Sequence, residues 1–190
     1  MAQACYRVKG MVSVLIYEPA EDSELLASQV KRFAKGKKVL DMGTGSGIQA
    51  RTANEAGASS VLAVDINRKA LTEVKKQGIP TCYSNLFAKV TGRYDLIVCN
   101  PPYLPADAQE DKESARATTG GKKGYEWILT FLTQAPKHLT KGGLMLLLLS
   151  SLTPRRKINA LLKKQNLTKK VLIQQKLFME QLEVWEIQQR

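Results

Sequence analysis

Residues 38–65 hold the pattern that most restricts how this chain can fold. An apolar run, Lys38–Met42, leads into a turn with glycine at positions 43, 45 and 47, and a helix-like segment, 48–56, follows it. A second apolar run, Ser60–Asp65, ends on an acid. Strand, glycine-rich turn, helix and strand in this order are typical of a parallel βαβ unit. The pattern therefore predicts an α/β fold built on a mostly parallel sheet.

The rest of the chain continues this alternation of helix and strand. Further helices are expected at Glu21–Phe33, 68–77, 124–138 and 153–164, and further strands at 81–84, Tyr94–Cys99 and 144–149. Two more strand-like runs, 170–176 and 180–188, predict a C-terminal antiparallel hairpin. The polar segment 104–123 is long for a loop, which favours a functional role. The expected architecture is a doubly wound, Rossmann-like sheet of seven strands, with the strand at 81–84 at one edge.

The residues Asn100-Pro101-Pro102-Tyr103, which follow the apolar run Tyr94–Cys99, carry the clearest chemical signal. Two prolines cannot continue a strand ladder, so the chain must leave the sheet there. Ligands of open α/β sheets bind at the carboxyl ends of the strands. The Asn100 side-chain oxygen and the Pro101 carbonyl are two acceptors, and Tyr103 offers an aromatic face. This set fits a planar group that bears an NH₂, because its two N–H bonds would meet the two acceptors.

Two acids accompany the glycine-rich turn. Asp41 lies two residues before Gly43, and Asp65 ends the next strand, where an acid can bind ribose hydroxyls. A nicotinamide dinucleotide site is one alternative, but its spacing is G-x-G-x-x-G, whereas this turn has G-x-G-x-G. An acid beside the turn suits a cationic sulfonium or ammonium better than a pyrophosphate, which needs N–H donors. The other alternative gives Asp41 and Asp65 only turn or capping roles.

Together these motifs resemble the class I S-adenosylmethionine-dependent methyltransferases, in the amino-methyltransferase group with an Asn-Pro-Pro-Tyr motif. Their order is similar to that of the HemK family, which methylates the glutamine of the Gly-Gly-Gln motif in class-one peptide release factors. The segments that carry the resemblance are Tyr17-Glu18-Pro19-Ala20-Glu21-Asp22-Ser23, 41–47, 64–67, 85–87, 100–103 and 120–124. The glycine turn begins at Gly43, so the resemblance is to the short archaeal and eukaryotic branch of that family.

The resemblance implies S-adenosylmethionine as the cofactor and a role for each motif residue. Asn100 and Pro101 would grip the amide that accepts the methyl group, and Tyr103 would stack on it. The residues implied to bind the cofactor are Tyr17, Glu21, Asp41, Gly43, Gly45, Gly47, Asp65, Ile66, Asn85, Leu86 and Asn100. Asn85 stands where the family usually has Asp, and an amide oxygen accepts less strongly than a carboxylate. No metal site is implied.

Composition and charge limit the class of protein. A chain of 190 residues with 44% hydrophobic residues fits a single domain, expected over 14–190 after an N-terminal tail, 1–13. Its three cysteines form no C-x-x-C pair, which argues against a zinc site or a disulfide framework. No signal peptide or bilayer-spanning run is evident, so we expect a cytoplasmic protein without a membrane partner. The formal net charge of +12 indicates an acidic partner or one close to nucleic acid.

Alternative functions and partners remain open at this point. A nucleic-acid methyltransferase would use the same four residues on the exocyclic amine of adenine or guanine, so nucleic acid is a conceivable but unnecessary partner. The third alternative is that the chain is a cofactor-binding subunit without enzymatic activity. The resemblance implies a peptide release factor as protein substrate and a small zinc-binding activator protein. We expect that activator to form a 1:1 heterodimer through the edge strand at 81–84.

Overall fold

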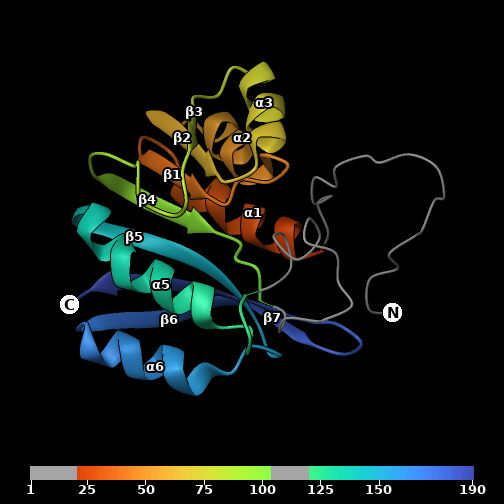
Figure 1. Cartoon of the computed structure of the whole chain (residues 1–190), viewed down its shortest axis with the longest axis vertical. Helices are drawn as coiled ribbons and strands as arrows, with labels where there is room; N and C mark the ends of the chain where they lie inside the picture. Colours follow the sequence, from red (N-terminus) through yellow and green to blue (C-terminus); the bar gives the residue numbers. More distant parts are fainter. Residues whose placement is uncertain (1–20, 104–119) are drawn as a thin grey trace.

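The computed structural model describes residues 21–103 and 120–190, which form one seven-stranded sheet with helices on both faces (Figure 1). The strands are β1 (Lys38–Met42), β2 (Ser60–Asp65), β3 (Thr81–Tyr83), β4 (Tyr94–Cys99), β5 (Leu139–Ser150), β6 (Leu167–Lys176) and β7 (Gln181–Gln189). The helices are α1 (Glu21–Phe33), α2 (Ile48–Glu55), α3 (Arg68–Lys76), α5 (Glu126–Gln134) and α6 (Arg155–Lys164), with a 3₁₀ turn at Ala135–His138. They cover the two faces of the sheet.

The strand order is β3-β2-β1-β4-β5-β7-β6. Strands β1 to β5 pair in parallel, and β7 runs antiparallel to both β5 and β6. The predicted Rossmann-like fold is therefore confirmed, including the C-terminal antiparallel hairpin and the position of β3 at one edge. The sequence pattern did not give the place of β7 between β5 and β6.

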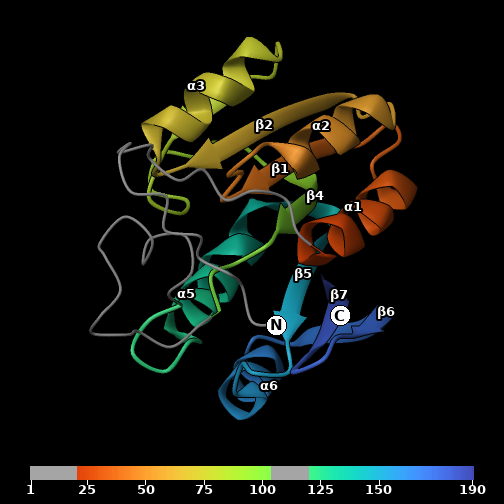
Figure 2. The same ribbon diagram turned by 90° about the vertical axis from the view of Figure 1, so that its right-hand side faces the viewer.

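Two hydrophobic clusters lie on opposite faces of this sheet. Helices α1, α2 and α3 cover one face, where Leu26, Ala50 and Leu146 belong to one buried cluster. Helices α5 and α6 cover the other face (Figure 2). Phe131 and Trp185 are fully buried there. The central strand β4 is buried along most of its length, as expected for a strand that is covered on both faces. Both helical layers therefore leave the ends of the strands as the place for a site.

Local sequence explains several element boundaries. The Asn67 side chain accepts hydrogen bonds from Lys69 N at 3.0 Å and Ala70 N at 3.4 Å, so it caps the start of α3. The helix expected over 124–138 is interrupted, because the Pro136 ring has no N–H and the chain tightens into the 3₁₀ turn after α5. Apart from β5, the other predicted bounds agree within three residues, close to the one or two residues by which element ends are commonly uncertain.

Strand β5 differs most from its predicted range. It begins at Leu139, although the apolar pattern predicted a strand only at 144–149. The pairing register between β4 and β5 shifts between Tyr94 and Leu96, and Gly142 lies in this stretch with φ 77°. A glycine in the left-handed region inside a strand is typical of a bulge. The two glycines at 142 and 143 therefore lie inside the strand instead of preceding it.

Some predictions fall outside the described residues. They are the N-terminal tail 1–13, the cofactor residue Tyr17 and the larger part of the polar segment 104–123. Within 21–103 and 120–190, no helix combines the length and the apolar character needed to cross a membrane.

Candidate active site

Most of the predicted site residues that the structure describes lie at one edge of the sheet, where β1, β2 and β4 reach their carboxyl ends. The glycine-rich turn follows β1, Asp65 is the last residue of β2, and Asn100 follows β4. Register places Met42 beside Val64 on one side and beside Cys99 on the other. Because the three strands are parallel neighbours, these segments lie together although up to sixty residues separate them.

Asp41 holds the glycine-rich turn from inside. Its Oδ2 accepts hydrogen bonds from Thr44 Oγ1 at 2.6 Å and from Ala50 N at 3.1 Å. The carboxyl is buried, and burial raises its pKa from 3.8 to about 7, while the hydrogen bonds from Thr44 and Ala50 oppose the rise. Asp41 therefore links the end of β1 to the start of α2. Turn chemistry, which the sequence left as an alternative, accounts for both of these contacts.

Asp65 bridges the same turn from the neighbouring strand. Its Oδ2 accepts from Gly45 N at 2.9 Å, and its Oδ1 accepts from Asn67 N at 2.7 Å. The backbone of the turn is also fastened to β2, because Gly43 N donates to Val64 O at 2.8 Å. The side chain of Asp65 is only half-buried, so the carboxylate that orders the turn remains accessible to a ligand.

The glycines of the turn have different surroundings. A Cβ added at Gly43 or Gly45 would have no heavy atom within 4 Å, so this side of the turn faces open space. A Cβ at Gly47, which has φ 80°, would lie 2.6 Å from Val74 Cγ2. Gly47 is the N-cap residue of α2, and it lets this helix begin against α3. The open side is where a small molecule can approach the backbone closely.

Three more of the residues predicted to bind the cofactor lie beyond Asp65. Ile66 is an exposed apolar residue directly after β2, and Asn85 is exposed just after β3. The two segments are neighbours, since Ser84 N donates to Asp65 O at 3.0 Å. Leu86 is buried and has φ 47°, an uncommon backbone conformation for a residue that is not glycine. Strained backbone of this kind concentrates at ligand sites, which fits a role beside the cofactor.

Asn100 has one tethered atom and one unpartnered atom. Its Nδ2 donates to Asp22 Oδ2 at 3.2 Å and to Ser23 Oγ at 3.4 Å, both in the first turn of α1. The carboxylate is acceptor-only, so it fixes which end of the amide is nitrogen. Asn100 Oδ1 is buried and has no hydrogen-bond partner among the described residues. A buried acceptor without a donor is costly, and a ligand N–H would satisfy it.

Two positioning features were not assigned a role from the sequence. Asp22 and Ser23 are buried and orient Asn100; their signal was the acidic segment that opens α1. The second feature is Gly120, where a Cβ would lie 2.7 Å from Pro102 O and 2.5 Å from Gly124 O. The loop 120–124 thus packs directly against the Asn-Pro-Pro-Tyr turn, and only glycine fits that contact.

The remaining predicted residues occupy distinct places. Pro101 is buried, and Tyr103 is half-buried against the hydrophobic cluster under α1. Burial raises the pKa of Tyr103, and the carboxyls of Asp22, Glu180 and Glu21 raise it further. Tyr103 therefore remains a neutral phenol at physiological pH. Glu21 is the exposed first residue of α1. The stacking of Tyr103 on a substrate and the contact of Glu21 with the cofactor stay predictions.

The chain was compared with families and proteins of known function. The methyltransferase small domain model matches residues 18–179. The chain belongs to this family. A candidate protein N5-glutamine methyltransferase of Methanocaldococcus jannaschii is 40% identical over 146 residues, which cover 73% of this chain and 74% of that protein. The release factor glutamine methyltransferase of Fusobacterium nucleatum is 39% identical over 105 residues, 48% of this chain and 30% of that protein.

Solved structures agree on the fold of this methyltransferase small domain. The E. cuniculi Mtq2–Trm112 complex, described as responsible for methylation of the eRF1 translation termination factor, contains a chain with TM-score 0.76 and 24% identity. The match covers 92% of this chain and 98% of that one. A T. thermophilus 16S rRNA methyltransferase in complex with AdoMet and guanosine has TM-score 0.66 and 20% identity, over 92% and 44% of the two chains.

The chain is therefore an S-adenosylmethionine-dependent methyltransferase, as the motifs predicted. Its own residues fit that cofactor. The open side of the turn at Gly43 and Gly45 admits the close approach of a small molecule, and the half-buried carboxylate of Asp65 suits ribose hydroxyls. Ile66 and Asn85 are both exposed beyond Asp65, and they offer one apolar and one polar side chain to the adenine base of the cofactor.

Proposed function

We propose that this methyltransferase transfers a methyl group to the side-chain amide nitrogen of the glutamine in the Gly-Gly-Gln motif of a class-one peptide release factor. The observation that carries the proposal is the buried Oδ1 of Asn100, which has no donor among the described residues. The names of the relatives from M. jannaschii and F. nucleatum, and of the E. cuniculi complex, support this substrate. A translation factor as substrate also supports a cytoplasmic location.

The chain's own residues act mainly by positioning. Asn100 Oδ1 accepts one N–H of the target amide, and the Pro101 carbonyl accepts the other. Both hydrogen bonds fix the nitrogen and draw its lone pair out of conjugation with the carbonyl, while Tyr103 supports the planar group. S-adenosylmethionine supplies a methyl group on a cationic sulfonium when it is bound. The amide is a weak nucleophile, so orientation contributes much of the rate, and the surplus proton passes to water.

A nucleic-acid amine is the second candidate substrate, and two observations favour it. The ribosomal RNA small subunit methyltransferase C of Haemophilus influenzae is 31% identical over 157 residues, 78% of this chain and 42% of that protein. The net charge of +12 is also high for an enzyme that acts on a neutral amide. An exocyclic amine would present the same two N–H bonds to Asn100 and Pro101.

The test is transfer of radiolabelled methyl to purified release factor, compared with ribosomal RNA and DNA from the same source. Asn100→Ala should lower transfer to the release factor roughly a hundredfold and lower cofactor affinity far less, because the main contact that it removes is the one with the reacting nitrogen. Asn159→Ala, an exposed asparagine on α6, is the matched control and should transfer at the normal rate. Label on nucleic acid alone, or normal turnover by Asn100→Ala, would contradict the proposal.

We also propose a 1:1 complex with a small zinc-binding activator protein. Among residues 21–103 and 120–190, strand β3 has only β2 as a paired neighbour, so its other side forms an edge of the described sheet. Tyr83 is exposed on this strand, with the Arg68 guanidinium 4.0 Å and the Lys89 ammonium 5.7 Å from its ring centre. An uncovered edge can accept a strand from another chain. The E. cuniculi complex, which pairs two proteins, supports a partner of this kind.

A further inference from the structure

The turn of the β6–β7 hairpin carries an exposed apolar surface. Phe178 is 88% exposed and Met179 is 69% exposed, and both lie in the turn 177–180. Leu152, 49% exposed, lies in the turn between β5 and α6. We call these three residues the hairpin patch. Large apolar side chains that are exposed together mark an interaction site more often than a chance arrangement.

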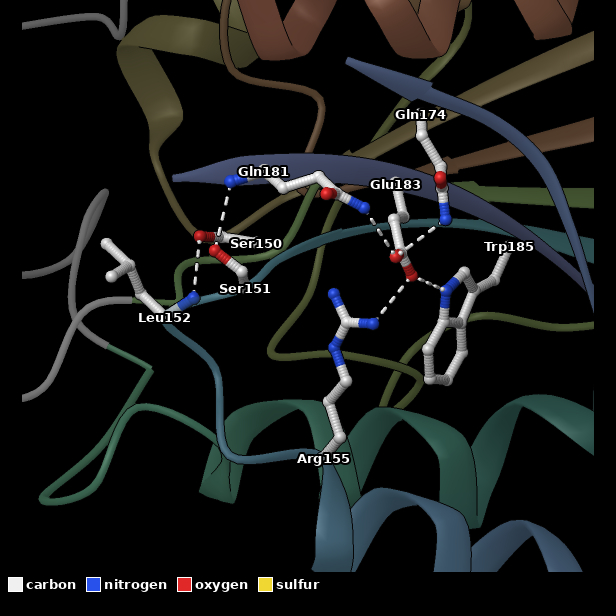
Figure 3. A network of polar contacts seen from close by, with 8 residues as sticks. All are labelled: Ser150, Ser151, Leu152, Arg155, Gln174, Gln181, Glu183 and Trp185. Carbon is white, nitrogen blue, oxygen red and sulfur yellow. Dashed lines mark hydrogen bonds and ion pairs between the residues drawn. The ribbon is translucent and has the colours of Figure 1, made fainter. Parts of the chain in front are cut away.

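A network of hydrogen bonds holds the two turns of the hairpin patch against each other (Figure 3). Ser151 N donates to Gln181 O at 2.8 Å, and Gln181 N donates to Ser151 Oγ at 2.9 Å. Ser150 Oγ also donates to the Glu180 carboxylate. The base of the hairpin and the turn after β5 are thus joined in both directions, which holds the patch in a defined position.

The same network continues into the sheet through Glu183. This buried carboxylate accepts from Trp185 Nε1 at 2.7 Å, from Gln174 Nε2 at 3.0 Å and from Arg155 at 2.8 Å. It therefore ties β6, β7 and the first residue of α6 together (Figure 3). A buried ion pair of this kind contributes defined geometry more reliably than net stability. Because these contacts already order the base of the hairpin patch, little conformational entropy is lost there when a partner binds.

The hairpin patch stands beside the transfer site. In β5, Leu147 pairs with Cys99, the residue before Asn100, and Ser150 pairs with Leu182, so the hairpin turn projects beyond the carboxyl edge of the sheet (Figure 1). Tyr103 and Leu177 pack against the same hydrophobic cluster. Glu180 is also close enough to Tyr103 to raise the pKa of its phenol. The hairpin patch and the Asn-Pro-Pro-Tyr turn therefore lie at the same edge of the sheet.

We propose that the hairpin patch docks the folded body of the protein that carries the target glutamine, while Asn100 receives the glutamine itself. The proposal rests on the release-factor function proposed above. The chemistry favours a protein partner, because Phe178 and Met179 need apolar side chains to cover them and the Glu180 carboxylate beside them repels phosphate. A neutral, flexible glycine-rich segment offers few contacts of its own, so a second anchor outside the site supplies affinity.

The test measures methylation of two substrates by a double variant of the hairpin patch and by a control variant. The substrates are full-length release factor and a short peptide with the Gly-Gly-Gln motif, and the enzyme is co-expressed with its activator protein. We expect Phe178→Ser/Met179→Ser to raise KM for the full-length protein about tenfold with kcat unchanged, as loss of an interface anchor does. Methylation of the peptide and cofactor affinity should not change. Val171→Ser, which removes an exposed apolar side chain from β6 away from the turn, is the control and should behave as the unaltered enzyme.

Each other outcome overturns a different part of the proposal. An unchanged KM for the full-length protein would overturn the docking role of the hairpin patch alone. An equal loss of methylation with the protein and with the peptide would overturn it too, because it would indicate a distorted active site. Loss of co-purification with the activator protein would assign the patch to the activator instead. If the unaltered enzyme methylates neither the protein nor the peptide, the release-factor function fails and the docking surface fails with it.

Discussion

At the scale of single residues, the site depends on side chains that hold other groups in place. Asp22 and Ser23 orient the amide of Asn100, so the direction of its buried acceptor Oδ1 is set by residues 77 and 78 positions away. Asp41 and Asp65 fasten the glycine-rich turn by accepting its N–H and hydroxyl donors. Asp41 and Asp65 therefore stabilise the turn even when no ligand is bound.

The burial of Asp41 predicts how the free energy of unfolding depends on pH. Its pKa is about 7 in the folded protein against an ordinary 3.8, so the folded state holds a proton that the unfolded state has released. The free energy of unfolding should therefore fall between pH 4 and pH 7, by roughly 4 kcal/mol from this group, and stay level above pH 7. Asp41→Asn should remove this part of the pH dependence in urea unfolding curves.

Asp95 provides a contrast of opposite sign. Its pKa is lowered by hydrogen bonds from Lys38 N and Thr140 Oγ1, so its stabilisation is present above the ordinary pKa and is lost as pH falls below it. The difference between the unaltered protein and Asp95→Asn should thus appear at neutral pH and shrink in acid. For Asp41, the free energies of unfolding of the unaltered protein and of Asp41→Asn should differ by an amount that changes between pH 4 and pH 7. A constant difference would show that burial does not raise the pKa of Asp41.

At the scale of elements, the contact between α2 and α3 depends on a missing side chain. Gly47 begins α2 with φ 80°, and Val74 of α3 lies where a Cβ would be. Gly47→Ala should cost about 2–4 kcal/mol, the sum of left-handed strain and steric overlap. Urea unfolding measures this loss. Gly36→Ala, at a similar φ of 69° but with nothing within 4 Å, should show only the strain, about 1 kcal/mol.

The overlap part can be separated by a double substitution. Val74→Ala removes the atom that the new Cβ would meet, so Gly47→Ala should be less destabilising in that background than in the unaltered protein. Additive losses would show that crowding between the two helices is not the cause.

At the scale of the whole molecule, the prediction concerns the edge strand β3. Ala63 N donates to Pro80 O and Ser84 N donates to Asp65 O, so the N–H of Tyr83 faces away from β2 in a parallel ladder. Tyr83→Pro should abolish a 1:1 complex with the activator protein, because proline removes the N–H that an added strand would need. Tyr83→Ala removes the side chain but keeps the N–H, so it should retain the complex.

Size-exclusion chromatography of the co-expressed proteins at micromolar concentration measures the outcome. The unaltered chain and Tyr83→Ala should elute with the activator, and Tyr83→Pro should elute separately while its far-UV circular dichroism is unchanged. Separate elution of the unaltered chain, or co-elution of Tyr83→Pro, would rule out assembly through this edge.

Local sequence patterns are sufficient to predict the parallel α/β architecture and the segments of the candidate site. Strand-like and helix-like runs are local patterns, and the glycine turn after β1 and the prolines after β4 are short-range chemistry that marks where the chain leaves the sheet. The start of β5 was misjudged, because a bulge at Gly142 depends on pairing with β4, which no local pattern records.

Which of these groups come into contact depends on how the whole domain packs. The contact of Asp22 with Asn100, the close packing of Gly120 on Pro102 and the position of the β6–β7 turn beside Tyr103 all join segments far apart in the chain. Such contacts follow from strand order and from the packing of helices on the sheet, and both are settled by burial over the whole domain. The sequence predicts residues of the candidate site, and the sheet brings those of 41–65 and 100–103 to one edge.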